Sequence, residues 1–205
     1  MQRAAYGEGV SRETEERLGI YCELLKKWNP RINLVAGGTI QDAAHRHFAD
    51  SVQIGHLATS WERWVDLGSG GGFPGLVVGC MFPESEVILV ESDRRKCLFM
   101  ETVIREVGIK ARTINERIAC VPELRADVVS ARALAPLDVL LGFMLRHASS
   151  NGVGLFLKGR GYRTELEQAR QRWTFDHETV QSRTQEDSAI LRVSRLKPVS
   201  GDSSV

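Results

Sequence analysis

The pattern of apolar positions along the chain changes near residue 61. In the first sixty residues, apolar side chains recur at the three- and four-residue spacing of a helix. One such stripe consists of Leu18, Tyr21, Leu25 and Trp28. Ser11 can cap this helix and Pro30 is expected to stop it, while a capping-box signal at Thr39 predicts a second helix that runs to about Leu57. Residues 1–60 are therefore predicted to form an N-terminal helical extension.

After Trp61 the pattern alternates between short apolar strands and amphipathic helices. The strands are predicted at residues 63–67, 86–92, 111–114, 126–133, 153–159, 175–181 and 189–196. The helices are predicted at residues 74–82, 94–107, 136–148 and 162–172. Asp93 and Gly108 bound the second of these helices, and Asn151 and Gly152 are expected to turn into the fifth strand.

Repeated β-α units of this kind indicate an α/β fold with a mostly parallel sheet covered on both faces. The last two strands are separated by only a polar loop, which favours antiparallel pairing at one edge. We therefore expect a Rossmann-like core at residues 61–197 with a seven-stranded sheet, one strand of it antiparallel. Residues 198–205 are expected to be a flexible tail.

The composition places few limits on function. The chain has 205 residues, of which 42% are hydrophobic and 26% charged, as in an ordinary soluble domain. We find no apolar run long enough for a membrane span and no signal-peptide pattern, so we expect a cytoplasmic protein. The four cysteines are scattered, which predicts reduced thiols and no metal site. A net charge of +1 neither requires nor excludes a nucleic-acid partner, so any basic patch must be local.

A glycine-rich stretch, VDLGSGGGFPG at residues 65–75, follows the first predicted strand. A nucleoside triphosphate loop would need Lys after Gly75, where this chain has Leu76. Gly68 and Gly70 match the first two glycines of the dinucleotide fingerprint, but its third falls on Phe73, which weakens a reading as an NAD-binding oxidoreductase.

S-adenosylmethionine fits this stretch better because it contains no pyrophosphate. It needs a tight strand-to-helix turn, which Gly68, Gly70 and Gly72 can form, and an acid that accepts the ribose hydroxyl groups. Glu91 lies at the end of the next predicted strand, in the position for that acid. Asp66 can act on the methionine amino group, directly or through water. The pattern favours a class I S-adenosylmethionine-dependent methyltransferase, with an oxidoreductase and a turn that binds no ligand left open.

The methyl acceptor is suggested by the end of the fourth predicted strand, VVSARALAPL at residues 128–137. The stretch lacks the Asn/Asp-Pro-Pro-aromatic tetrapeptide of enzymes that methylate exocyclic amines. Cys120 lies too far upstream to be a nucleophile for cytosine C5. An acceptor with a lone pair, such as guanine N7 or a deprotonated hydroxyl, needs alignment rather than a general base. Arg132 ends this strand, where ligands bind in open α/β sheets, and is a candidate for positioning the substrate.

Several segments together resemble one protein family. They are LLKKWNPRINLVA, HRHFADSV, VDLGSGGGFPGL, LVESDRRKCLFM, VVSARALAPL and LFLKGRG. In this order and spacing they resemble the bacterial small-subunit rRNA methyltransferase G family, also called glucose-inhibited division protein B. The resemblance covers roughly residues 18–195. It implies a cytoplasmic enzyme that moves the methyl group of S-adenosylmethionine to N7 of one guanine in 16S rRNA. We expect the partner to be the small ribosomal subunit or its assembly intermediate, and the protein to be a monomer.

The resemblance also implies roles for individual residues. Those it assigns to the cofactor site are Gly68, Phe73, Glu91, Ile118, Ala119 and Arg132, with Glu91 in place of the family's usual Asp. Lys158 joins Arg132 as a candidate for positioning the substrate, and no residue is assigned as general base. Candidate RNA contacts are Asn33, His47, Lys158 and Arg160. Asp50 and Ser51 match the family's N-terminal motifs without a readable role. A non-catalytic docking module that binds S-adenosylmethionine remains an alternative.

Overall fold

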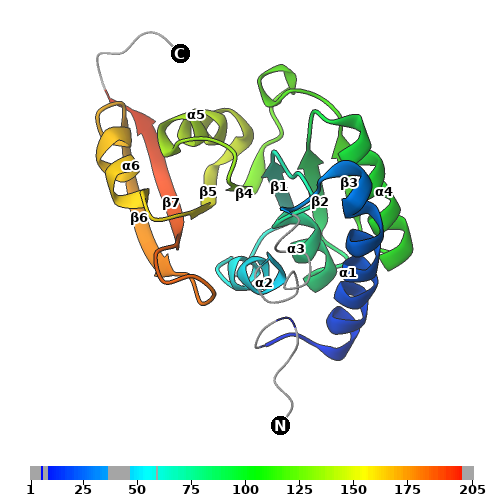
Figure 1. Cartoon of the computed structure of the whole chain (residues 1–205). Coiled ribbons are helices and arrows are strands. Elements are labelled where there is room, and N and C mark those ends of the chain that lie inside the picture. The colour runs from blue at the N-terminus through cyan, green and yellow to red at the C-terminus, as the bar shows by residue number, and fades with distance from the viewer. Residues whose placement is uncertain (1–5, 7–8, 37–46, 59, 200–205) are drawn as a thin grey trace.

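The structure is a computed structural model that describes residues 6, 9–36, 47–58 and 60–199 (Figure 1). The helices are α1 (Arg12–Ile32), α2 (Ala49–Gly55), α3 (Gly75–Met81), α4 (Arg94–Val107), α5 (Leu137–His147) and α6 (Tyr162–Ala169), with a short 3-10 helix η3 at Ile118–Cys120. The strands are β1 (Arg63–Leu67), β2 (Glu86–Val90), β3 (Ala111–Ile114), β4 (Ala126–Arg132), β5 (Ala148–Lys158), β6 (Trp173–Gln181) and β7 (Ala189–Pro198).

In the described chain, the strands form one seven-stranded sheet in the order β3-β2-β1-β4-β5-β7-β6. The strands from β1 to β5 pair in parallel, whereas β7 pairs antiparallel with both β5 and β6. The predicted sheet, with its single antiparallel strand, is confirmed. Chain order reverses between β1 and β4, so this is the switch point at whose carboxyl edge open α/β sheets bind ligands.

Each face of the sheet is covered by its own helices. One apolar cluster contains residues of α1 to α4, and the other contains residues of α5 and α6. Leu18 and Tyr21 of α1 are fully buried in the first cluster together with Leu76 of α3. The described helices of the N-terminal part therefore share a core with the sheet. The division of the chain at residue 60 stays a prediction.

Helix capping follows the sequence closely. Ser11 caps α1 by accepting a hydrogen bond from the backbone N–H of Thr14. Asp93 caps α4 through the N–H of Arg95, and Gly108 ends that helix with φ +65°. These three caps confirm the predicted ends. The predicted capping box at Thr39, and residues 200–205 of the predicted tail, lie outside the described residues.

Three predicted boundaries are wrong. Pro30 lies within α1, because a missing N–H near the end of a helix removes only one bond; the helix continues until the N–H of Asn33 closes it on Asn29 O at 3.0 Å. Asn151 and Gly152 belong to β5, where extra residues are taken up by a register shift opposite β4 rather than by a turn. Helix α6 ends at Ala169, three residues earlier than predicted.

The described residues contain no helix that is long and apolar enough to cross a membrane. All four cysteines are free thiols, and Cys120 is the exposed one. Among the described residues no three His, Cys, Asp or Glu side chains come together in a way that could hold a metal ion.

Candidate active site

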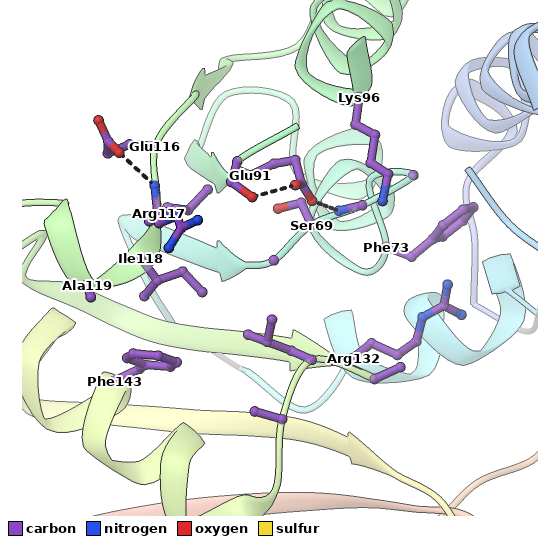
Figure 2. Close-up of a pocket in the computed structure, with 18 of the residues that line it drawn as sticks. Ser69, Phe73, Glu91, Lys96, Glu116, Arg117, Ile118, Ala119, Arg132 and Phe143 are labelled. Carbon is purple, nitrogen blue, oxygen red and sulfur yellow. Dashed lines mark hydrogen bonds between the residues drawn. The ribbon is translucent and has the colours of Figure 1, made fainter. Parts of the chain in front are cut away.

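A pocket of about 650 Å³ opens at the carboxyl ends of β1, β2 and β4. Figure 2 shows Glu91 and Ser69 on one side of this pocket, Ile118, Ala119 and Phe143 on another, and Arg132 beside Phe73. We call it the first pocket. Other residues that line it are Leu34, Gly68, Gly70, Gly71, Lys96, Arg117, Ala133 and Leu134. The sequence-predicted residues Asp66 and Gly72 do not line it.

The glycine loop after β1 depends on a left-handed backbone. Gly68, Gly70 and Gly72 have φ values of +63°, +58° and +93°, which side-chain-bearing residues rarely adopt. A Cβ atom on Gly72 would also lie 2.3 Å from Leu76 Cδ1 and 2.7 Å from the hydroxyl of Tyr21. Gly72 therefore lets the loop pack closely against Leu76 and Tyr21, and it does not line the first pocket.

Glu91 ends β2 and faces the first pocket. Its carboxylate accepts hydrogen bonds from the N–H of Gly70 at 2.9 Å and from the N–H of Asp93 at 2.8 Å. These bonds connect the glycine loop to the start of α4 and orient the carboxylate. A carboxylate has about four acceptor positions, so Glu91 can still accept from the hydroxyl groups of a ribose.

Asp66 is fully buried behind the loop. Its Oδ1 accepts from Ser130 Oγ at 2.6 Å, and its Oδ2 accepts from the N–H of Gly75 at 3.3 Å. Burial raises the pKa of Asp66 to about 6, against the opposing effect of these hydrogen bonds. Ser130 in turn accepts from Trp64 Nε1 at 2.8 Å. Asp66 thus connects β1, β4 and α3, and any effect on a ligand would be indirect.

The wall formed by Ile118 and Ala119 is held by a residue that the sequence did not suggest. Arg146, near the end of α5, donates to the carbonyl groups of Ala119 at 2.9 Å and Val121 at 3.0 Å. The only sequence signal for Arg146 is a basic residue in the last turn of a helix, which is a common feature of helix ends. Its partner segment could not have been inferred from that signal.

A second pocket, of about 540 Å³, lies at the carboxyl ends of β4 and β5. It shares Leu34, Arg132 and Ala133 with the first pocket, so the two are neighbours. Its other lining residues are Val35, Ala36, His47, Asp50, Leu157, Lys158, Gly159, Glu165, Gln185 and Ser188. Both pockets therefore meet at the end of β4.

Arg132 stands at this junction. Its guanidinium lies over the ring of Phe73, 4.9 Å from the centroid, and its Nη1 lies 2.8 Å from Nδ1 of His47. Because a guanidinium only donates, Nδ1 of His47 must accept, which places the ring proton on Nε2. Burial lowers the pKa of Arg132. The sequence predicted Arg132 and His47 separately, and the structure brings them together.

The remaining predicted residues have structural contacts. Lys158 is buried, with Nζ 2.6 Å from Glu165 Oε2 and 2.9 Å from Ala135 O, so its charge is compensated within the protein. Arg160 is exposed and pairs with Asp187 at 2.8 Å. Asn33 caps α1 at φ +48°.

Asp50 and Ser51 of α2, which match the family's N-terminal motifs, also have structural contacts. Ser51 donates to the carbonyl of His47 at 2.7 Å, which fixes the start of the helix. Asp50 accepts hydrogen bonds from Ser182 and Thr184, in the loop between β6 and β7. The two residues belong to α2, whereas their partners range from four to more than 130 residues away.

Solved structures share this arrangement. A TehB-like S-adenosylmethionine-dependent methyltransferase from Corynebacterium glutamicum matches with a TM-score of 0.60 and 14% sequence identity, covering 88% of this chain and 100% of that chain. The strand order and the position of the pocket at the glycine loop give this chain the fold of the class I methyltransferases.

The chain belongs to the family described as rRNA small subunit methyltransferase G, whose model matches residues 14–191. A ribosomal RNA small subunit methyltransferase G from Paramagnetospirillum magneticum is 49% identical over 186 residues, which cover 90% of each chain. Another from Paracoccus denitrificans is 47% identical over 190 residues, covering 92% of this chain and 98% of that protein. The family predicted from the sequence motifs is confirmed.

Proposed function

We propose that this protein transfers the methyl group of S-adenosylmethionine to N7 of a guanine in 16S rRNA. The observation that carries the proposal is the pair of adjoining pockets that share Arg132, in a chain of the methyltransferase G family. The first pocket would hold the methyl donor and the second pocket the guanine. The end of β4 between them is where the methyl group would pass.

The donor side is supported by the fit of the residues that are present. Glu91 offers acceptor positions for the ribose, and Ile118 with Phe143 offers an apolar surface for the adenine. The glycine loop approaches as bare backbone, where Gly70 has no heavy atom closer than 3.8 Å to an added Cβ. Phe73, at the third position of a dinucleotide fingerprint, is buried against the ring of Tyr21, which argues against a pyrophosphate there.

The chemistry requires little from the protein beyond alignment. The N7 lone pair of guanine takes the methyl carbon from the sulfonium of S-adenosylmethionine as the carbon–sulfur bond breaks, leaving S-adenosylhomocysteine and a cationic guanine. No proton has to leave before the attack, so the lack of a catalytic base at the end of β4 is consistent with this reaction. Positioning alone can supply roughly 7–11 kcal/mol of the barrier.

The acceptor would be a base turned out of its stack. A pocket of about 540 Å³ can enclose one purine, and enzymes that modify bases in folded nucleic acid extrude them into such pockets. Arg132 is the substrate-positioning residue of this proposal. Lys158 supports the pocket wall through Glu165 rather than contacting RNA.

The partner of this proposal is the small ribosomal subunit or its assembly intermediate, which would make the protein cytoplasmic. We also propose that it acts as a monomer. The large apolar side chains that are exposed in the described part of the chain are scattered over α1, α4, α5 and the residue that follows β7. They are Ile20, Leu98, Val139, Leu145 and Val199.

The test is transfer of labelled methyl from S-adenosylmethionine to small ribosomal subunits that lack this modification. The expected result is label in 16S rRNA and chain cleavage by borohydride and aniline at 7-methylguanosine. Arg132→Ala should abolish most of the transfer while the protein remains folded. Label in RNA without cleavage would reject N7, and binding of S-adenosylmethionine without transfer to any ribosomal particle would favour a docking module.

A further inference from the structure

We propose that the second pocket distinguishes guanine from adenine through two groups of opposite charge, with Arg132 donating to guanine O6 and Asp50 accepting from guanine N1–H. This inference rests on the proposed function, because it takes an rRNA purine as the ligand of the second pocket. It assigns a specificity-determining role to Asp50.

Asp50 is a buried carboxylate that uses one of its two oxygens. Its side chain belongs to a residue only 7% exposed, and Oδ1 accepts both from Ser182 Oγ at 3.0 Å and from the hydroxyl of Thr184. Oδ2 receives no hydrogen bond from the described residues. Since Asp50 lines the second pocket, a donor in that pocket can reach a carboxylate that the two hydroxyls already hold in place. A ligand donor there would use the acceptor capacity of Oδ2 that the two hydroxyls leave free.

Arg132 carries the complementary unused groups. Nη1 donates to His47, and the other N–H groups have no acceptor among the described residues. Arg132 and Asp50 line the same pocket without forming an ion pair with each other in the described chain, although the charge of Asp50 acts on Arg132 and opposes the lowering of its pKa by burial. Two opposite charges that do not pair leave room for a ligand between them.

A donor, Arg132, and an acceptor, Asp50, in the same pocket match the base edge of guanine and not that of adenine. Guanine presents the acceptor O6 beside the donor N1–H, whereas adenine presents a donor amine beside the acceptor N1. Guanine therefore offers an acceptor to Arg132 and a donor to Asp50. Adenine would place its amine donor against Arg132 and its N1 acceptor against Asp50, so neither hydrogen bond could form. A single bond from Arg132 to O6 also leaves the neighbouring N7 lone pair free to react.

The other carboxylate of the second pocket is already used within the protein. Glu165 Oε2 accepts from Lys158 Nζ at 2.6 Å and from the N–H of Leu137 at 2.7 Å. Its charge is neutralised by that lysine. Asp50 is therefore the acidic group of the pocket whose capacity is open to a base.

Asp50→Asn tests the inference with little change in shape. The amide keeps an oxygen for Ser182 and Thr184, but it replaces Oδ2 with a donor that would face guanine N1–H. We expect kcat/KM for transfer to guanine-bearing RNA to fall by about 100-fold, in line with the loss of one base-specific contact and the gain of a donor–donor clash. The Kd for S-adenosylmethionine should stay within about twofold of wild type.

The second measurement is selectivity. Transfer is compared on two 16S rRNAs that carry guanine or adenine at the methylated position, once that position has been mapped with the wild-type protein. Wild type should strongly prefer guanine. In Asp50→Asn the guanine-to-adenine ratio of kcat/KM should fall by at least tenfold, because the new amide N–H can donate to adenine N1.

Gln53→Ala is the matched control. Gln53 lies on the same helix, donates to Gln181 O at 2.8 Å and accepts from the N–H of Arg183 at 3.1 Å, but does not line the second pocket. The variant therefore loosens the contact between α2 and the β6–β7 loop while leaving the Asp50 carboxylate intact. Its guanine-to-adenine ratio should equal that of wild type, whatever happens to its overall rate.

The outcomes separate the two proposals. If wild type transfers no methyl to guanine, the proposed function fails and the inference falls with it. If wild type is active and Asp50→Asn keeps both the wild-type rate and the wild-type ratio, the inference alone is overturned. A lower rate with an unchanged ratio also overturns it, since that is the signature of a residue that only holds the loop.

Discussion

His47 supports the guanidinium of Arg132 at the junction of the two pockets, and this contact leads to a quantitative prediction. His47→Leu removes the acceptor that lies 2.8 Å from Arg132 Nη1 and keeps an apolar side chain near Phe73. His47→Asn replaces the imidazole with a side chain whose oxygen can take the place of Nδ1. The two variants differ mainly in whether they can accept a hydrogen bond from Arg132.

The size of the effect follows from the kind of bond. A hydrogen bond to a charged group contributes about 1.5–3 kcal/mol. If that energy serves to hold Arg132 in its reactive position, His47→Leu should lower kcat/KM by roughly 10- to 150-fold, at 1.36 kcal/mol for each factor of ten. His47→Asn should recover most of the loss. A protein that keeps its wild-type Tm would exclude unfolding as the cause.

The assay is transfer of labelled methyl to small ribosomal subunits, with kcat and KM measured separately and the affinity for S-adenosylmethionine measured by calorimetry. The informative comparison is a double-variant cycle with Arg132→Ala. In that background His47→Leu should change kcat/KM by less than about threefold, because the group that it positions is gone. The reasoning is refuted if His47→Leu and His47→Asn are equally impaired, or if the effects of His47→Leu and Arg132→Ala simply add.

Three further predictions concern stability and cofactor binding. Lys158→Met leaves Glu165 without its buried partner and should lower the free energy of unfolding by about 3 kcal/mol in urea titrations, while the salt dependence of RNA binding stays unchanged. Asp66 has a pKa of about 6 in the folded protein against 3.8 for an exposed aspartate, so the stabilisation from its proton is complete below about pH 3.8 and is lost as the pH rises through 6. Relative to Asp66→Asn, wild type should therefore lose about 2.4 kcal/mol of stability between pH 4 and pH 7.5, and a difference that does not vary with pH would contradict the raised pKa. Gly72→Ala should abolish binding of S-adenosylmethionine in calorimetry because its Cβ would collide with Leu76. Gly70→Ala, with open space and only backbone strain of about 1–2 kcal/mol, should weaken binding by roughly 5- to 30-fold.

Much of the fold could be predicted because it depends on local signals. The β1 strand, the glycine loop and α3 follow one another within twenty residues, and the caps at Ser11, Asp93 and Gly108 involve partners at most four residues away. Prediction from local signals failed where packing of a whole helix outweighed the preference of one residue. Pro30 interrupts one bond in a helix whose apolar face is already packed, so the helix continues beyond it.

The site could be predicted only in part, because several roles depend on partners far away in the chain. The position of Glu91 follows from the spacing of a β-α-β unit, and the structure agrees. Lys158, a candidate RNA contact, pairs with Glu165 in the structure, and no sequence pattern indicated that ion pair. The bond between Asp50 and Thr184 spans 134 residues, so the role of Asp50 became readable only when the last hairpin was in place.

The two pockets also differ in how much of the chain they require. Every residue that lines the first pocket lies between Leu34 and Phe143, whereas the second pocket takes Lys158 and Ser188 from the last third of the chain. The part of the protein that binds the methyl donor is therefore complete in sequence before the β6–β7 hairpin begins. Changes in length or sequence of that hairpin can alter which base is accepted without altering the use of S-adenosylmethionine. Changes at Leu34, Arg132 or Ala133, which line both pockets, would instead affect both at once.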